Sequence, residues 1–132
     1  MLSLLAMESA LGLVLEAGLD KIRDKSVALT SYLIFLLDTV LVPLGFDLGT
    51  PRDPEQRGSH VSIRHPEAYR INRALIEEMQ VIPDFREPDS IRLGLSPLYT
   101  SFADVWEAVD RTRRTVAEGR HLRYSPDRQT VT

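Results

Sequence analysis

The sequence contains no cysteine, and Lys21 and Lys25 are the only lysines among its 132 residues. Without thiols the chain has no disulfide framework, no thiolate metal site and no cysteine nucleophile. With two lysines it has few candidates for chemistry that needs a reactive amine. The formal net charge of -3 at pH 7 argues against a nucleic-acid-binding protein. Its length is sufficient for one domain with its own core.

Long uninterrupted apolar runs are also lacking. The first 18 residues are apolar, but they have no basic leader and contain Glu8 and Glu16, unlike a secretion signal or a membrane span. A second apolar run, over residues 32–45, is interrupted by Asp38 and stopped by Pro43. The sequence therefore predicts a soluble protein located in the cytoplasm.

Two helices are predicted at the start of the chain. Residues 2–16 have the pattern of a helix that Gly18 ends, and this helix is apolar nearly all round. A helix of that kind is normally buried on several sides, so we expect that a surface outside this chain packs on it. A longer helix over residues 20–42 carries an apolar stripe at helical spacing.

The remaining elements alternate between strands and helices. We expect a short edge strand at 46–48, strands at 59–65, 81–85 and 89–99, a helix at 66–80 that starts with Pro66, and a helix from Ser101 to Gly119. This order predicts an α/β protein of the α+β two-layer type, with a small, mostly antiparallel sheet and helices on one face. We divide the chain into linking helices (1–43), a small α/β domain (44–119) and a loose polar tail (120–132).

The strand over residues 89–99 carries an arginine near its centre. Isoleucine and leucine occupy alternate positions, so that Arg92, Gly94 and Ser96 share the opposite face. The small neighbours leave a recess beside a planar guanidinium, which can hold a carboxylate through two parallel hydrogen bonds. Arg92 is therefore the candidate ligand-binding residue. The alternatives are an exposed strand arginine or a structural ion pair.

The three histidines are candidates for ligand binding or metal coordination. His60 lies on the same predicted face as Arg92 and is placed to orient a ligand, the alternative being a histidine that only packs. His65 and His121 lack partners at metal-ligand spacing, so no metal is predicted. The sequence has no Gly-rich phosphate loop and no nucleophile elbow. The arginines near the carboxy terminus indicate a solvated helix face, because no aromatic platform accompanies them.

Three motifs together resemble the carboxy-terminal part of kynureninase. They are QRGSHVSI at 56–63, the V-x-x-D-x-R-x-P-x-x-I-R run at 81–92, and PLYTSFADV at 97–105. The resemblance extends back through residues 2–30, which are similar to the helices that link the large and small domains of that family. Kynureninases are homodimeric, cytoplasmic pyridoxal-phosphate enzymes of fold type I, aminotransferase class V. They hydrolyse L-kynurenine, or its 3-hydroxy form, to anthranilate (or 3-hydroxyanthranilate) and L-alanine in tryptophan catabolism.

The resemblance implies specific roles for two residues of this chain. Arg92 would hold the α-carboxylate of the amino-acid substrate, with His60 as a supporting polar group. Lys21 and Lys25 do not match the family's cofactor lysine, which lies upstream of where this chain begins. The resemblance therefore implies a fragment that contributes substrate recognition, with no catalytic or cofactor-binding residue of its own. Pyridoxal 5'-phosphate would be bound in the intact parent enzyme and not by this chain alone, and the missing amino-terminal large domain would be a partner.

Two alternative functions remain open from the sequence. Another class V enzyme, such as a cysteine desulfurase or selenocysteine lyase, typically depends on a cysteine that is often carried in this part of the chain, and this sequence has none. A stand-alone binding or oligomerisation module without cofactor would use the apolar first helix as its interface. A lysine-bearing large domain upstream in the native gene would favour the kynureninase hypothesis.

Overall fold

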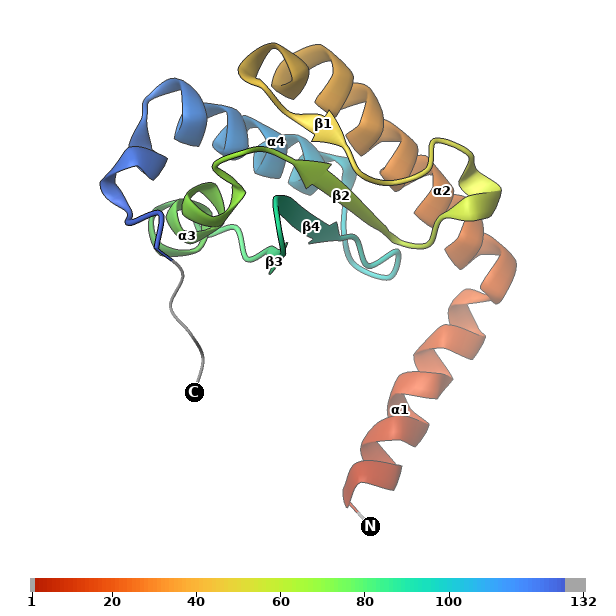
Figure 1. The fold of residues 1–132 in the computed structure, drawn as a ribbon. Helices are drawn as coiled ribbons and strands as arrows, with labels where there is room; N and C mark the ends of the chain where they lie inside the picture. Colours follow the sequence, from red (N-terminus) through yellow and green to blue (C-terminus); the bar gives the residue numbers. More distant parts are fainter. Residues whose placement is uncertain (1, 128–132) are drawn as a thin grey trace.

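Two consecutive helices begin the chain in the computed structural model, which describes residues 2–127, with side chains from residue 7 onward. Helices α1 (Leu2–Ala17) and α2 (Leu19–Leu36) are separated by Gly18, whose φ of 82° favours glycine. The predicted end of the first helix is thus confirmed. Helix α1 projects away from the rest of the molecule (Figure 1), and its leucines at 11, 13 and 15 are all more than half exposed.

Helix α2 contributes the longest stripe of the core. Leu29, Leu33, Leu37 and Leu41 are each at most 1% exposed. Four-residue steps drift by about 40° each around a regular α-helix. Here the last two leucines begin and end a π-helical turn, η1 (Leu37–Leu41), and its wider turn offsets part of that drift.

A short 3-10 helix, η2 (Val42–Leu44), ends the helical segment at Gly45. By length and composition alone, Leu19–Leu44 is apolar enough to cross a membrane. A core helix of a soluble protein passes the same test, and the buried leucine stripe of α2 identifies this segment as a core helix.

Four short strands form one antiparallel sheet in the order β1-β2-β4-β3. Their bounds are β1 (Asp47–Leu48), β2 (His60–Arg64), β3 (Asp84–Arg86) and β4 (Ser90–Gly94). The connector between β1 and β2 contains one 3-10 turn, η3 (Pro54–Gln56). This sheet confirms the predicted antiparallel arrangement, including the short edge strand. The strands themselves are shorter than predicted at 81–85 and 89–99.

Helices cover only one face of the sheet (Figure 1). Val61, Ile63, Ile91 and Leu93 point toward them and are at most 6% exposed. They share one hydrophobic core with residues of α2, α3 (Ala68–Glu78) and α4 (Phe102–Ala117). The predicted two-layer α+β fold is therefore confirmed.

Helix α3 begins two residues later than predicted. Pro66 was expected at its first position, whereas the first helical residue is Ala68. The chain turns at His65 instead: its carbonyl accepts from the Ala68 N–H, and its Nδ1 accepts from the Glu67 N–H at 3.0 Å. A local side-chain contact thus displaces the start that the proline indicated.

The prediction of a loose tail from residue 120 is wrong for its first part. Residues 120–123 form a 3-10 helix, η4 (Arg120–Arg123), and His121 is 6% exposed. Arg70 of α3 donates to the carbonyl oxygens of Leu122 and Tyr124, both within 2.8 Å. Polar contacts therefore hold a segment that its low apolar content did not predict. Residues 128–132 lie outside the described part, and the division into segments 1–43 and 44–119 stays a prediction.

Candidate functional site

The polar face of the sheet is the face that the helices leave uncovered. Alternation places His60, Ser62 and Arg64 of β2 on it, together with Ser90, Arg92 and Gly94 of β4. In the register of these strands Ser62 lies opposite Arg92, and His60 lies opposite Gly94. The face predicted around Arg92 is therefore present in the fold.

The surface next to Arg92 is open at Gly94. A Cβ atom built on Gly94 would meet no heavy atom within 4 Å, and Gly94 has no positive φ that would require glycine. Its lack of a side chain therefore provides space and not backbone freedom. The Arg92 side chain is 37% exposed, so its guanidinium is accessible to a ligand that enters beside Gly94.

Asp84 is a member of this site that the sequence analysis missed. It lies directly opposite Arg92 on the neighbouring strand β3, and its Oδ2 accepts a hydrogen bond from Arg92 Nη2. The same Oδ2 accepts from Arg86 Nε at 2.9 Å. Two guanidinium groups thus share one carboxylate oxygen, which leaves one positive charge without a partner within this cluster. Such a surplus favours the binding of an anion.

His60 occupies the row next to Arg92 on the same face. It is exposed and lies opposite Gly94, so it belongs to the uncovered face and not to the core. The alternative that His60 is a packing histidine is not supported by this position. A supporting role toward a ligand stays a prediction.

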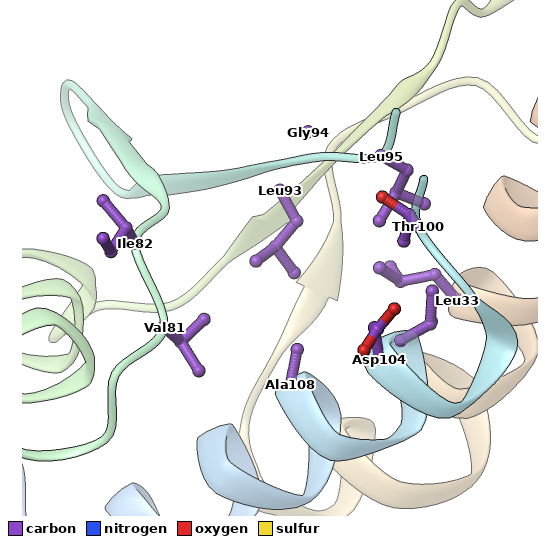
Figure 2. A pocket seen from close by; sticks show the side chains of 10 residues that line it. Leu33, Val81, Ile82, Leu93, Gly94, Leu95, Thr100, Asp104 and Ala108 are labelled. Carbon is purple, nitrogen blue, oxygen red and sulfur yellow. The ribbon is translucent and has the colours of Figure 1, made fainter. Parts of the chain in front are cut away.

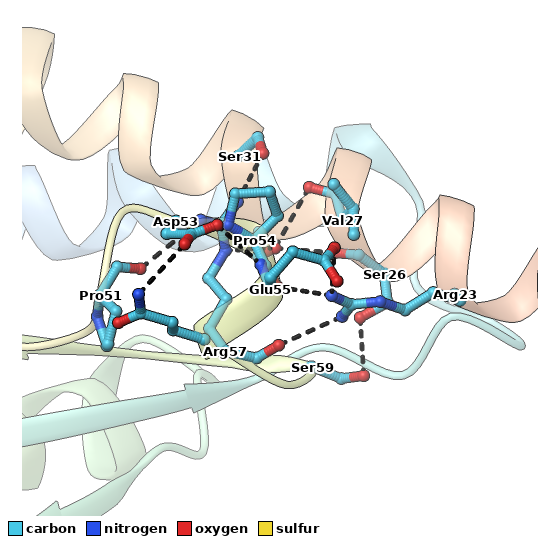
Figure 3. Close-up of polar contacts among 12 residues, drawn as sticks. Arg23, Ser26, Val27, Ser31, Pro51, Asp53, Pro54, Glu55, Arg57 and Ser59 are labelled. Carbon is cyan, nitrogen blue, oxygen red and sulfur yellow. Dashed lines mark hydrogen bonds and ion pairs between the residues drawn. The ribbon is translucent and has the colours of Figure 1, made fainter.

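The connector that leads into β2 is held on α2 by a buried arginine (Figure 3). Arg57, 9% exposed, donates from Nε to Thr30 Oγ1 at 3.1 Å and from Nη2 to Ser31 Oγ at 2.6 Å. Its Nη1 donates to the carbonyl oxygen of Arg52. Arg23 of α2 in turn donates to the Arg57 carbonyl at 3.1 Å. This network fixes the chain three residues before His60, and so positions the start of the polar face.

A cavity with a mostly apolar lining lies on the other side of the sheet. It has a volume of about 200 Å³ and lies between β4 and helix α4, where Leu93 points toward Ala108 (Figure 2). Its one charged lining residue, Asp104, is engaged in the cap of α4. Apart from Asp104 and Thr100 its lining has no polar side chain, and it carries no cation, so this cavity offers no positive charge to a carboxylate.

The lysines do not form a cofactor site with the other described residues. Lys21 lines an open groove of about 670 Å³ with Glu16, Leu98 and Tyr99. Tyr99 is 82% exposed, so the groove lacks the enclosing walls and the set of phosphate donors that pyridoxal phosphate requires. Lys25 lies in α2, which belongs to the helical layer. The described residues therefore do not fit this cofactor, and the position of the cofactor lysine outside this chain stays a prediction.

The other two histidines have structural partners. Burial lowers the pKa of His65, whose Nδ1 accepts from a backbone N–H and whose Nε2 lies 3.3 Å from the carbonyl oxygen of Leu44. This pairing selects the neutral tautomer with the proton on Nε2. His121 Nδ1 lies 3.2 Å from the Thr115 carbonyl oxygen. Within residues 2–127 no group of three or more potential metal ligands is found.

Comparison with known proteins identifies relatives along almost the whole chain. The family model of the kynureninase C-terminal domain matches residues 22–112. Kynureninase from Geobacillus thermodenitrificans is 40% identical over 131 residues, which are 99% of this chain and 30% of that relative. Kynureninase from Shouchella clausii is 40% identical over 98% of this chain and 30% of its own length. Kynureninase from Pseudomonas fluorescens is 43% identical over 81% of this chain and 26% of its own length.

These matches contain the residues that form the polar face. The family model covers strands β1 to β4 and most of helix α4, and so includes both Arg92 and Asp84. The chain spans about 30% of the length of the first curated relatives it matches. On this match the chain belongs to the kynureninase C-terminal domain family.

Proposed function

We propose that this chain is the substrate-recognition part of a kynureninase-like hydrolase that depends on pyridoxal phosphate. The parent enzyme cleaves L-kynurenine, or its 3-hydroxy form, to anthranilate or 3-hydroxyanthranilate and L-alanine, in tryptophan catabolism. One observation carries this proposal: the Arg92 guanidinium lies beside the open space at Gly94 on the uncovered face of a domain that matches this family.

In this proposal Arg92 binds the α-carboxylate of the amino-acid substrate. A guanidinium offers two parallel N–H donors to a carboxylate, and the charge surplus around Asp84 strengthens the attraction. His60 lies on the same face and orients the bound substrate. Pyridoxal phosphate supplies the electron sink for the cleavage when it is bound. Because the described residues do not fit that cofactor, its lysine and its phosphate donors come from a large domain outside this chain.

The proposal includes an assembly and a cellular location for the parent enzyme. The parent enzyme is a cytoplasmic homodimer, and this chain contacts its large domain across the uncovered polar face. Neither nucleic acid nor a membrane is among its partners.

The alternative function is not favoured, because the chain matches the domain family of an enzyme, but the test of the proposal must be able to detect it. The exposed leucines of α1 suit a stand-alone binding or oligomerisation module that has no cofactor. The two hypotheses differ in the native protein. A mass roughly three times that of this chain, in line with the 30% coverage of the relatives, together with visible absorbance from bound pyridoxal phosphate, supports the enzyme. A native mass of 14.9 kDa without that absorbance supports the module.

The role of Arg92 is tested by Arg92→Lys in the intact native protein. Lysine keeps the charge but loses the two-pronged geometry. We expect the KM for L-kynurenine to rise by about tenfold or more, the size of one charge-assisted hydrogen bond, with a smaller change in kcat. Arg73→Lys is the matched control, because Arg73 forms its ion pair with Glu77 within helix α3, outside the polar face of the sheet. An unchanged KM for Arg92→Lys would contradict the assigned role.

A further inference from the structure

Arg92 and Asp84 form a directly opposed pair across strands β3 and β4. Residues at such positions point to the same face of an antiparallel sheet, with Cβ atoms about 5 Å apart. The Asp84 carboxylate contacts Nη2 of Arg92. The guanidinium has five N–H donors, and Nη2 carries two of them. The contact with Asp84 uses one, so the other Nη2 N–H and a neighbouring N–H group remain as a two-pronged edge for a second carboxylate.

A partly exposed arginine needs such a partner to present a fixed edge to a ligand. Its side chain is long and has many rotamers, and ordering it has an entropic cost. Asp84 is short and extends from a paired strand, so its carboxylate has little freedom to move. The ion pair therefore restricts the direction of the Arg92 guanidinium before any ligand arrives, which lowers the ordering cost at binding.

Arg86 limits how far Asp84 neutralises Arg92. Arg86 Nε lies 2.9 Å from the same Oδ2 atom that Arg92 contacts. If Asp84 paired with Arg92 alone, their charges would cancel and an incoming carboxylate would meet no net attraction. With two guanidinium groups on one carboxylate, orientation and a surplus positive charge exist at the same site.

We propose that Asp84 is a positioning residue: it holds Arg92 in the orientation that presents the remaining guanidinium edge to the substrate carboxylate, while Arg86 shares its charge. This inference rests on the proposed function of Arg92 and adds the residues that make that function effective. It predicts a change in carboxylate affinity that is opposite to the change expected from charge alone. Removing the negative charge of Asp84 weakens carboxylate binding, although electrostatics alone would strengthen it.

The test uses the 132-residue chain and acetate as the carboxylate probe. The side-chain Nε–H resonance of Arg92, assigned by its loss in Arg92→Lys, is followed by NMR during titration with sodium acetate. A parallel titration with sodium chloride keeps the ionic strength equal. We expect Asp84→Asn to weaken the acetate response by about threefold, within the range of a surface ion pair. Asp84→Glu is expected to restore part of it. Arg86→Gln is expected to weaken it, because Asp84 then pairs with Arg92 alone and neutralises its charge.

The outcomes separate this inference from the proposed function. If Arg92 of the unaltered chain does not respond to acetate beyond chloride, the carboxylate-binding role and this inference both fail. If Arg92 responds but Asp84→Asn binds acetate equally or more tightly, only the positioning role of Asp84 is overturned. If the backbone amide spectrum shows that Asp84→Asn does not fold, Asp84→Glu decides. Glutamate keeps the negative charge but places the carboxylate one methylene farther from the strand, so acetate binding as tight as in the unaltered chain then overturns the positioning role.

Discussion

At the scale of single residues, the most buried arginine of the described chain contributes to stability and not to the ligand site. Arg57 is 9% exposed, and its guanidinium serves two hydroxyl groups of α2 and backbone carbonyls of the connector. A planar group with five donors fits acceptors in several directions at once, which a lysine ammonium on a flexible stem does not. Arg57 thus joins the connector before β2 to the helical layer.

Replacement of Arg57 by lysine tests this contribution. Several hydrogen bonds from one charged group are lost, so the free energy of unfolding is expected to fall by about 2–4 kcal/mol, measured by urea denaturation. Arg52→Lys is the matched control, because Arg52 forms an exposed ion pair with Asp38 at 2.8 Å. That substitution is expected to cost less than about 1 kcal/mol. Equal losses in the two variants would contradict a special role for Arg57.

The two members of the central ion pair differ in how far the sequence predicts them. Strand alternation was sufficient to place Arg92 on the uncovered face, because the positions on either side of it are isoleucine and leucine. Asp84 belongs to the V-x-x-D-x-R motif, but its contact with Arg92 depends on the register between β3 and β4. A register is set by the turn and by packing across strands, which no single strand encodes. The sequence had also left a structural ion pair open for Arg92, and the structure shows that Arg92 does form one.

At the scale of elements, α4 begins with a capping box at Ser101, the residue at which the sequence predicted the start of this helix. Ser101 Oγ accepts from the Asp104 N–H at 3.1 Å, and the Asp104 carboxylate accepts from the Ser101 N–H at 2.8 Å. Hydrogen bonds from the backbone and side chain of Ser101 lower the pKa of Asp104. The cap starts α4 one turn before Val105, the first residue of its buried face. It also follows directly on the loop that leaves β4.

The capping box makes a prediction for Ser101. Ser101→Ala removes the side-chain acceptor and is expected to lower the free energy of unfolding by about 1 kcal/mol. Ser101→Asn keeps a good capping side chain and is expected to remain within about 0.5 kcal/mol of the unaltered chain. Thermal unfolding followed by circular dichroism measures both variants. A loss of the same size in the asparagine variant would show that the cap is not the cause.

Other features of the elements could not be read from local sequence. The start of α3 follows a contact of the His65 ring with the backbone, and that contact overrides the preference of Pro66 for a first helical position. The 3-10 helix at 120–123 is ordered by Arg70 of α3, which is about 50 residues away in the chain. The first is a local contact between a side chain and the backbone, and the second is a tertiary contact; hydrophobic periodicity and composition indicate neither.

At the scale of the whole molecule, the two layers leave two different surfaces exposed. The open face of the sheet is polar and carries the Arg92 cluster, whereas α1 presents leucines to solvent on several sides. Leu11, Leu13 and Leu15 are 52%, 61% and 68% exposed. A projecting apolar helix exposes hydrophobic surface to water, and such a surface is typical of an interaction site. The predicted covering of α1 therefore requires a surface other than those that residues 7–127 provide.

The isolated chain is accordingly expected to associate with itself through α1. Sedimentation equilibrium should show an apparent mass that rises with concentration from 14.9 kDa toward that of a dimer, the commonest closed assembly. The double variant Leu11→Glu with Leu15→Glu places two charges on one side of α1 and should keep the chain monomeric. Ile82→Glu is the control, because Ile82 is 85% exposed but lies on the segment before β3. Association that persists in the double variant, or that Ile82→Glu abolishes, would place the contact elsewhere. A monomer at every concentration would mean that α1 does not bind a second copy of itself. Its leucines would then be covered by a different chain or domain.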